Sequence, residues 1–319
     1  MKAFYLSALA LALLGVAAVP PPDPSLFAEG VVSTPDDEFG LALAPDGRTA
    51  FFGKSSPATD GDPMQVICVT RLNAQGKWGD PEIASFSGQY HDMGPAFQPD
   101  GSRLFFISDR PGLDGGKQNF NIWYVERTAT GWSDPRALAA RVNSPAQEYG
   151  VTVSTNGTLY FASNREGGTG SFDIYRSKLE GGEYRTVENL GGPVNTKGLE
   201  LQPAISPDET TLVFLALQRD DERIGVHKAY ARGDLYVSFQ HDGTWSAPRN
   251  CGPKINSGAA ESWPGFSTDG RRLFFASERG FATYRMARPM IWSELKRGLT
   301  STLNGMGNIY EVSSEILRQ

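Results

Sequence analysis

Short apolar runs alternate with polar residues along the whole chain, and similar tight turns recur between them. Five turns share one pattern: LAPDGRTAFF, FQPDGSRLFF, VSTNGTLYF, ISPDETTLVF and FSTDGRRLFF. Their turn residues are Asp46, Asp100, Asn156, Asp208 and Asp269, at spacings of 54, 56, 52 and 61 residues. Short alternating segments around Pro-Asp-Gly or Asn-Gly predict β-hairpins. The regular spacing of these hairpins predicts a repeat protein of five units.

Each unit carries two further predicted strands. The third strands are Asn121–Trp123, Asp173–Tyr175, Asp234–Tyr236 and Asn308–Tyr310, with Val66–Cys68 in the first unit. The fourth strands are marked by an aromatic residue shortly after a glycine, namely Trp78, Trp132, Tyr184 and Trp245. Four strands in a unit of about 50 to 60 residues match the size of a propeller blade. The sequence therefore predicts an all-β fold, a five-bladed β-propeller of four-stranded blades, with blades at 36–88, 89–145, 146–197, 198–258 and 259–312.

The last unit lacks a clear fourth strand, and the N-terminal segment offers one. Val32-Ser33 precedes Glu38 by six and five residues, and an apolar residue followed by Asn stands at the same offsets in three later units: Val142-Asn143, Val194-Asn195 and Ile255-Asn256. We therefore expect residues 26–33 to complete the last blade and close the ring. Closure would leave no exposed sheet edge.

The repeat resembles the TolB-type, WD-like (Pro-Asp-Gly) β-propeller repeat family. The resemblance rests on segments such as ELQPAISPDE, SNREGGTGSFDIY and GTWSAPRN, and it covers residues 38–312. It implies an exported bacterial protein that binds more often than it catalyses. TolB itself has an additional N-terminal α/β domain and six blades, so its partners do not transfer to this chain of five repeats.

The N-terminus predicts export. Met1-Lys2 is followed by an apolar run from Ala3 to Val16 and by small residues up to Ala18, which is typical of a signal peptide over residues 1–18. A membrane anchor is the alternative, although the run is short for a span. Residues 19–319 would then form a single domain, periplasmic or secreted. We expect no membrane span after signal cleavage, and a monomer.

Composition excludes several classes of protein. With 21% charged and 11% aromatic residues, the chain is not of the disordered type. A net charge of −6 argues against nucleic-acid binding, which needs a basic surface. The two cysteines, Cys68 and Cys251, are too few for a disulfide scaffold or a four-cysteine zinc site, and their blades are not neighbours, so no disulfide is expected.

A carboxylate stands eight residues before each turn residue: Glu38, Asp92, Glu148, Glu200 and Glu261. Each precedes the innermost strand, so all five should lie near one mouth of the central channel. Two of them, such as Asp92 and Glu200, would suit the acid and base of a glycan hydrolase. A catalytic pair needs unlike surroundings, however, whereas five copies at one offset favour a structural role.

Hairpin geometry predicts partners for these acids. Arginines fall across the hairpin in three blades, which predicts the ion pairs Asp92–Arg110, Glu148–Arg165 and Glu261–Arg279. Blade four has Arg219 one residue further along, and blade one has only Lys54, two residues short.

Two long loops, 218–233 and 280–307, break the repeat at the same predicted mouth. The second, here called the flap, carries Arg285, Arg288, Lys296 and Arg297, and a short helix is expected over Ser293–Leu299. A basic flap over an acidic mouth would bind an anionic ligand or a peptide carboxylate. The alternative is that the flap only fills the mouth.

Three residues beside the carboxylates, His91, Tyr149 and Trp263, also depart from the repeat. Their rings would stack on a sugar or a peptide side chain, or else pack within the rim. No metal-ligand spacing or cofactor motif is present, so neither a metal nor a cofactor is predicted.

The sequence favours a TolB-like exported propeller that acts as a non-enzymatic binding or scaffold module. Its ligand would be a protein, peptide or glycan, held at the propeller mouth. A glycan-acting hydrolase and a purely structural envelope component are the alternatives.

Overall fold

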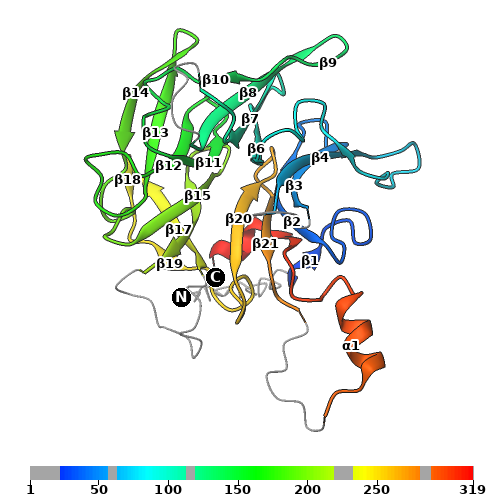
Figure 1. Cartoon of the computed structure of the whole chain (residues 1–319). Helices are drawn as coiled ribbons and strands as arrows, with labels where there is room; N and C mark the ends of the chain where they lie inside the picture. The colour runs from blue at the N-terminus through cyan, green and yellow to red at the C-terminus, as the bar shows by residue number, and fades with distance from the viewer. Residues whose placement is uncertain (1–21, 57–62, 113–118, 219–232, 281–288, 319) are drawn as a thin grey trace, which may run out of the picture.

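The computed structural model describes residues 22–56, 63–112, 119–218, 233–280 and 289–318. Five antiparallel sheets stand around a central channel, and Figure 1 looks approximately along that channel. The predicted five-bladed propeller of four-stranded blades is confirmed. The proposed signal peptide, Arg219, Arg285 and Arg288 lie outside the described residues. Within those residues, no helix has the length and apolar character needed to cross a membrane.

Each blade contributes one strand to every layer, from the channel outward. The inner strands are β2 (Asp37–Leu43), β6 (Asp92–Phe97), β11 (Glu148–Val153), β15 (Leu199–Ile205) and β20 (Glu261–Phe266). The second strands are β3 (Thr49–Ser55), β7 (Arg103–Ser108), β12 (Leu159–Ser163), β16 (Thr211–Leu217) and β21 (Arg272–Ser277). The third strands are β4 (Gln65–Arg71), β8 (Asn121–Thr128), β13 (Asp173–Glu180), β17 (Asp234–His241) and β22 (Asn308–Ser313).

The outer strands are shorter and less regular. They are β5 (Glu82–Ile83), β9 (Gly131–Trp132) with β10 (Arg136–Ala137), β14 (Glu183–Asn189), β18 (Thr244–Trp245) with β19 (Arg249–Asn250), and β1 (Ser25–Leu26). The outer strand is split in blades two and four, where Pro135 and Pro248 stand between the two halves. Proline has no N–H for the ladder, which accounts for the interruption.

The apolar core lies between neighbouring blades. The second strands are buried on both faces, as Phe105-Phe106 and Phe274-Phe275 show, each at most 1% exposed. Because blades pack against both sides of these strands, their sequences are continuous apolar runs rather than alternating ones.

The N-terminal segment closes the ring as predicted, although with different bounds. β1 pairs antiparallel with β22, with Ser25 opposite Glu311 and Leu26 opposite Tyr310. The strand covers two residues, and Ala28–Ser33 form a turn instead of the expected strand. The turn occurs because this segment is equivalent to the connections between blades. Val31 donates its N–H to the carbonyl of Ala28, three residues back, and Val142 donates in the same way to the carbonyl of Ala139.

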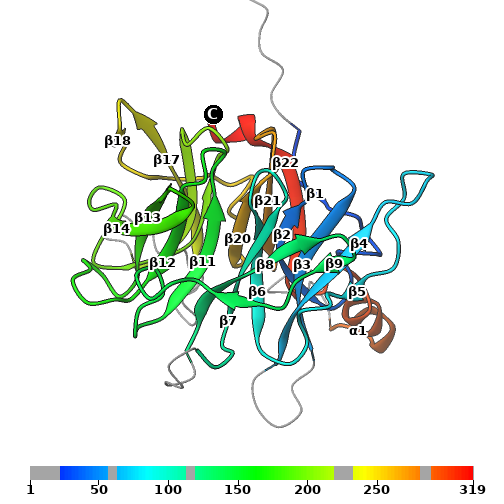
Figure 2. The ribbon, with the colours of Figure 1, turned by 90° about the horizontal axis from the view of Figure 1, so that it is seen from above.

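The remaining elements are one α-helix and one 3₁₀ helix within the described residues. The helix α1 (Trp292–Leu299) belongs to the flap, and η1 (Ser314–Arg318) follows β22. Figure 1 shows α1 beyond the rim of the ring, and Figures 1 and 2 both show it displaced laterally from the channel axis on the side of blade one. The helical part of the flap therefore does not cover the mouth, in contrast to the expectation that the flap would lie over one side of it.

Candidate functional site

The five repeated carboxylates lie at the start of the inner strands, and each has 0% exposure. In four blades a Ser or Thr four residues earlier donates both its backbone N–H and its hydroxyl to the two carboxylate oxygens. For Glu148, Ser144 donates from N over 3.1 Å and from Oγ over 2.6 Å. In blade two, Ser87 Oγ donates to Asp92 over 2.8 Å. Each acid thus fixes the connection that enters its blade.

The three predicted ion pairs are present. The nitrogen–oxygen distances are 2.6 Å for Arg110–Asp92, 3.0 Å for Arg165–Glu148 and 3.5 Å for Arg279–Glu261. The register differs from the expectation, because a serine stands opposite each acid and the arginine reaches back from two residues further on. For the same reason Lys54, which seemed two residues short, stands directly opposite Glu38 and pairs with it at 2.9 Å.

Burial affects the ionisation of two of these acids. Desolvation raises the pKa of Glu148 and of Glu261, and hydrogen bonds from Ser144 and Ser257 together with the neighbouring arginines oppose that rise. Asp92 forms an ion pair with Arg110, and Glu200 accepts hydrogen bonds from Thr196. Neither is among the residues that line the two channel cavities described below.

The position two residues after each carboxylate has a left-handed backbone in all five blades. The φ angles are +56° at Gly40, +58° at Gly94, +71° at Gly150, +50° at Gln202 and +48° at Trp263. A register shift in every inner strand follows or includes this position. Glycine adopts such a backbone freely, whereas a side chain there costs about 1–3 kcal/mol. Blades four and five therefore carry strained side chains where the other three blades have glycine.

Trp263 occupies the channel from this position. Its ring lies against the backbone of Gly94, where an added Cβ would stand only 2.3 Å from Trp263 Cζ3. Its centroid is 5.5 Å from that of Phe39 and 5.6 Å from that of Tyr149. The backbone N–H of Trp263 donates to Gln202 Oε1 over 2.9 Å, so the two strained residues support each other. The missing side chains of the glycines make the room that this indole fills.

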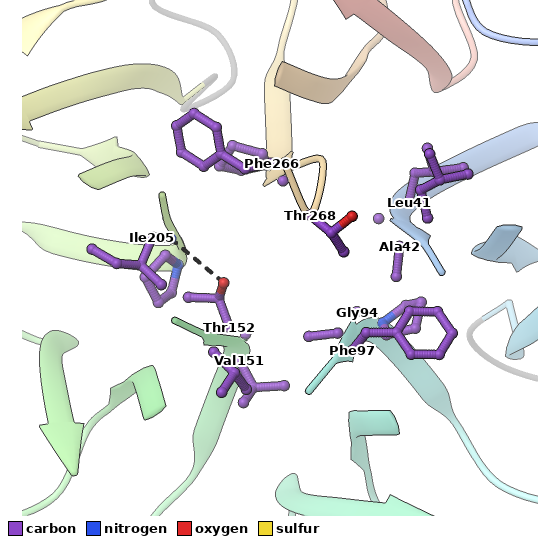
Figure 3. Close-up of a pocket in the computed structure, with 18 of the residues that line it drawn as sticks. Leu41, Ala42, Gly94, Phe97, Val151, Thr152, Ile205, Phe266 and Thr268 are labelled. Carbon is purple, nitrogen blue, oxygen red and sulfur yellow. Dashed lines mark hydrogen bonds between the residues drawn. The ribbon is translucent and has the colours of Figure 1, made fainter. Parts of the chain in front are cut away.

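Trp263 lines two cavities. The carboxylate-end cavity has a volume of about 220 Å³, with Tyr149, Phe39 and Trp263 among its apolar lining and a polar wall from Asp37, Glu38, Ser55, Gln65, Ser262 and Glu278. The turn-end cavity, at the opposite end of the channel, has a volume of about 80 Å³. Its lining comes from all five inner strands and includes Leu41, Phe97, Val151, Ile205 and Phe266. Polar side chains such as Thr152 and Thr268 also line it (Figure 3).

The predicted site residues are only partly brought together. Glu38, Tyr149 and Trp263 line the carboxylate-end cavity, while Glu148 and Glu261 lie behind it in their ion pairs. His91 Nδ1 is 2.6 Å from Oε1 of the cavity residue Gln65, which places the imidazole one layer outside the cavity. The C-terminal end of the flap reaches the cavity, because Gly307 N donates to Asp37 Oδ1 over 3.0 Å.

Sequence reasoning missed Asp37, Phe39, Gln65 and Gln202. A signal for Gln202 was available, since the repeat contains glycine two residues after the acid in EFG, DMG and EYG but not in ELQ and ESW. Among the described residues, no group of three or more His, Cys, Asp and Glu is arranged to hold a metal ion. Cys68 and Cys251 are both buried free thiols, in agreement with the predicted lack of a disulfide.

The similarity to known proteins concerns the fold alone. No protein-family profile matches the chain, and no curated protein matches it by sequence. Among solved structures, a puromycin-hydrolysing peptidase of Mycobacterium tuberculosis aligns with a TM-score of 0.44 and 16% identity over 85% of this chain and 41% of the peptidase. This chain thus spans less than half of that enzyme.

Two further similar structures differ from each other in kind. The α-L-arabinofuranosidase of Lactobacillus brevis aligns with a TM-score of 0.48 and 12% identity over 90% of this chain and 93% of the enzyme. A nidogen/laminin complex aligns with a TM-score of 0.45 and 13% identity over 75% of this chain and 72% of the matched chain.

Proposed function

We propose that this protein is an exported, TolB-like β-propeller that binds a protein, peptide or glycan ligand without catalysing a reaction. The ligand would insert one residue, either a sugar ring or a side chain, into the carboxylate-end cavity. The observation that carries the proposal is Trp263, a bulky aromatic held in a left-handed backbone at a position where three other blades have glycine. Strain of this kind persists where the surrounding structure over-determines it, and it concentrates at functional sites.

The cavity supports such a ligand in size and chemistry. Its volume of about 220 Å³ is well above the roughly 10–15 Å³ that a single water molecule needs on the same measure. The wall of the cavity is mostly polar, and the tilted rings of Trp263 and Tyr149, both partly exposed, contribute to its smaller apolar part. Asp37, Gln65 and Ser262 add acceptors and donors around that surface. An aromatic platform beside hydrogen-bonding groups suits a sugar ring, with its apolar face and its hydroxyls.

The ionised groups at this mouth favour a neutral or cationic ligand over the anionic one expected from the flap. Asp37 and Glu278 are part of the cavity wall, and Glu38 is the only one of the five repeated acids that lines it. Glu38 is ion-paired with Lys54, whose ammonium group also contacts Asp36 at 2.8 Å. Within the described residues the cavity lining includes no arginine or lysine.

The hydrolase alternative would use Asp92 and Glu200 as acid and base. A catalytic acid has to reach the substrate within hydrogen-bonding distance. Asp92 is fully buried and 2.6 Å from Arg110, and Glu200 is fully buried and accepts two hydrogen bonds from Thr196. The ion pair of Asp92 and the hydrogen bonds of Glu200 therefore support a structural role for both acids.

A screen of defined ligands tests the proposal. The mature protein is incubated with mono- and oligosaccharides and with short peptides, its melting temperature is recorded, and the mixtures are then analysed by mass spectrometry for cleaved products. We expect a rise in melting temperature with at least one ligand and no cleavage. Turnover of a glycan would support the hydrolase instead, and a screen without any thermal shift would count against binding at this mouth.

A further inference from the structure

The flap exposes an apolar surface that the proposed binding site does not use. Within the described residues, seven of the eight exposed large hydrophobic side chains lie between residues 290 and 306: Met290, Ile291, Trp292, Leu295, Leu299, Leu303 and Met306. The eighth is Ile83, on the outer strand of blade one. Scattered exposed apolar residues need no explanation, whereas a concentration of this kind marks an interaction surface.

The helix α1 organises the centre of this surface. Trp292, Leu295 and Leu299 follow the spacing i, i+3, i+7, which places them on one face of the helix. Their exposures are 72%, 40% and 61%, so that face contacts little of the propeller. The helix touches the body elsewhere, since its one buried residue is Gly298. Trp292 and Leu299 therefore present most of their apolar area to the surroundings.

The charged residues of α1 indicate which kind of partner this surface would bind. Lys296 and Arg297 are both exposed in the last turn of α1, next to the apolar face. The one acid of the helix, Glu294, lies in the first turn, where its carboxylate accepts the Ile291 N–H over 3.1 Å. The chain as a whole has a net charge of −6, so this is a locally basic edge on an acidic protein. Such an edge complements an anionic partner.

The shape of the apolar surface formed by α1 and its flanking segments favours one kind of partner over another. A groove on another protein would take the narrow stripe of α1 alone. Here the apolar side chains also come from the segments on both sides of the helix, at Met290, Leu303 and Met306. Figure 1 shows α1 projecting from the body beyond the ring of blades. A projecting, broad apolar surface with a Trp and flanking basic residues matches the way interfacial helices lie in a lipid headgroup layer.

We propose that α1 and its flanks dock the protein onto an anionic lipid surface. Trp292, Leu295 and Leu299 would enter the boundary between headgroups and acyl chains. Lys296 and Arg297 would extend their charged ends towards the phosphates. The docking surface is separate from the carboxylate-end cavity, so this proposal and the proposed function are tested independently.

Vesicle flotation tests the docking. The mature protein is mixed with vesicles of phosphatidylglycerol and phosphatidylethanolamine, or of phosphatidylcholine alone, and the floated fraction is measured. We expect binding to the anionic vesicles, weaker binding to phosphatidylcholine, and weakening with added salt. Removing the two largest exposed side chains in Trp292→Ser/Leu299→Ser should lower the partition coefficient at least about tenfold, since each buried CH₂ contributes about 0.8 kcal/mol. Lys296→Glu/Arg297→Glu should abolish the preference for anionic vesicles.

The matched control is Ile83→Ser, which removes an apolar side chain of 57% exposure from blade one and should float like the wild type. Circular dichroism checks that each variant is folded, and the single variant Trp292→Ser serves if the double one is not. No flotation of the wild type, or equal flotation of the Trp292→Ser/Leu299→Ser variant, would overturn the proposal. Concentration-dependent dimerisation that this variant abolishes, without flotation of the wild type, would replace the lipid surface by a second copy of the chain.

Discussion

The ion pair between Glu148 and Arg165 gives the sharpest test of a structural role for the repeated acids. Glu148 is fully buried and accepts four hydrogen bonds: from Ser144 N, Ser144 Oγ, Ser163 Oγ and Arg165 Nη2. The guanidinium of Arg165 also lies over the rings of Phe161 and Tyr175, at 5.1 and 4.9 Å. The perturbations are Glu148→Gln, Arg165→Met and the two combined.

The two single substitutions should differ in cost. Arg165→Met leaves a fully buried carboxylate without its cation, which should lower the free energy of unfolding by about 3–5 kcal/mol. Glu148→Gln keeps the shape of the side chain and leaves Arg165, which is 15% exposed, partly hydrated. Its cost should be about 1–3 kcal/mol, the usual range for a hydrogen bond to a charged group. In the double variant the two costs should overlap by about 1–3 kcal/mol.

Urea unfolding followed by tryptophan fluorescence measures these values. The control cycle uses Arg185 and Glu183, an ion pair of 3.1 Å whose side chains are 59% and 69% exposed. Exposed pairs are screened by water, so the control coupling should be below about 1 kcal/mol. Additive costs in the Glu148–Arg165 cycle, within the error of the control cycle, would refute a structural ion pair.

Three further predictions concern ring closure, the channel and pH. A variant that starts at residue 36 loses the strand that pairs with β22 and the buried side chains Phe27 and Val32. Its melting temperature should be lower by about 10 °C or more than that of a variant starting at residue 22. An unchanged melting temperature would disprove ring closure by this segment. Gly94→Ala places a Cβ against Trp263 and should lower the free energy of unfolding by about 1–3 kcal/mol. In a protein that already carries Trp263→Gly, the cost of Gly94→Ala should be smaller. An equal cost of Gly94→Ala in the wild type and in the Trp263→Gly variant would contradict the contact. Burial raises the pKa of Glu148 above 4.5, so its titration adds stability at pH below 4.5 that is lost as the pH rises through the raised pKa. Because Gln does not titrate, the destabilisation caused by Glu148→Gln should become smaller as the pH rises from 4.5 through the raised pKa. A destabilisation that grows with pH over this range would contradict the raised pKa.

Much of the fold was predictable because the repeat states it five times. The turn residues fixed the hairpins, and the equal offsets of Val32 and Val142 before their acids indicated which segment closes the ring. The arginine partners followed from hairpin geometry, although the exact register did not. A side chain as long as arginine reaches across two residues of strand, so an ion pair alone leaves the register open by that amount.

The candidate site was less predictable, for a physical reason. Residues that line the channel are selected by the bulge in each inner strand, and a bulge shifts which side chains face inward. Trp263 was noticed as a departure from the repeat, but its left-handed backbone and its contact with Gly94 arise only when five blades converge. The position of α1 was not predictable either, because blades one to three have no loop of comparable length between their second and third strands.

The affinity of a Trp263→Gly variant for a ligand found in the screen tests the central claim most directly. Glycine restores the residue that blades one to three carry at this backbone conformation, so the strand should keep its shape while the aromatic platform disappears. By calorimetry we predict a loss of affinity of at least about tenfold, as expected for removing a stacking aromatic side chain. Phe97→Leu, in the turn-end cavity, should bind as the wild type does. Unchanged affinity in Trp263→Gly would contradict ligand binding at the carboxylate-end mouth.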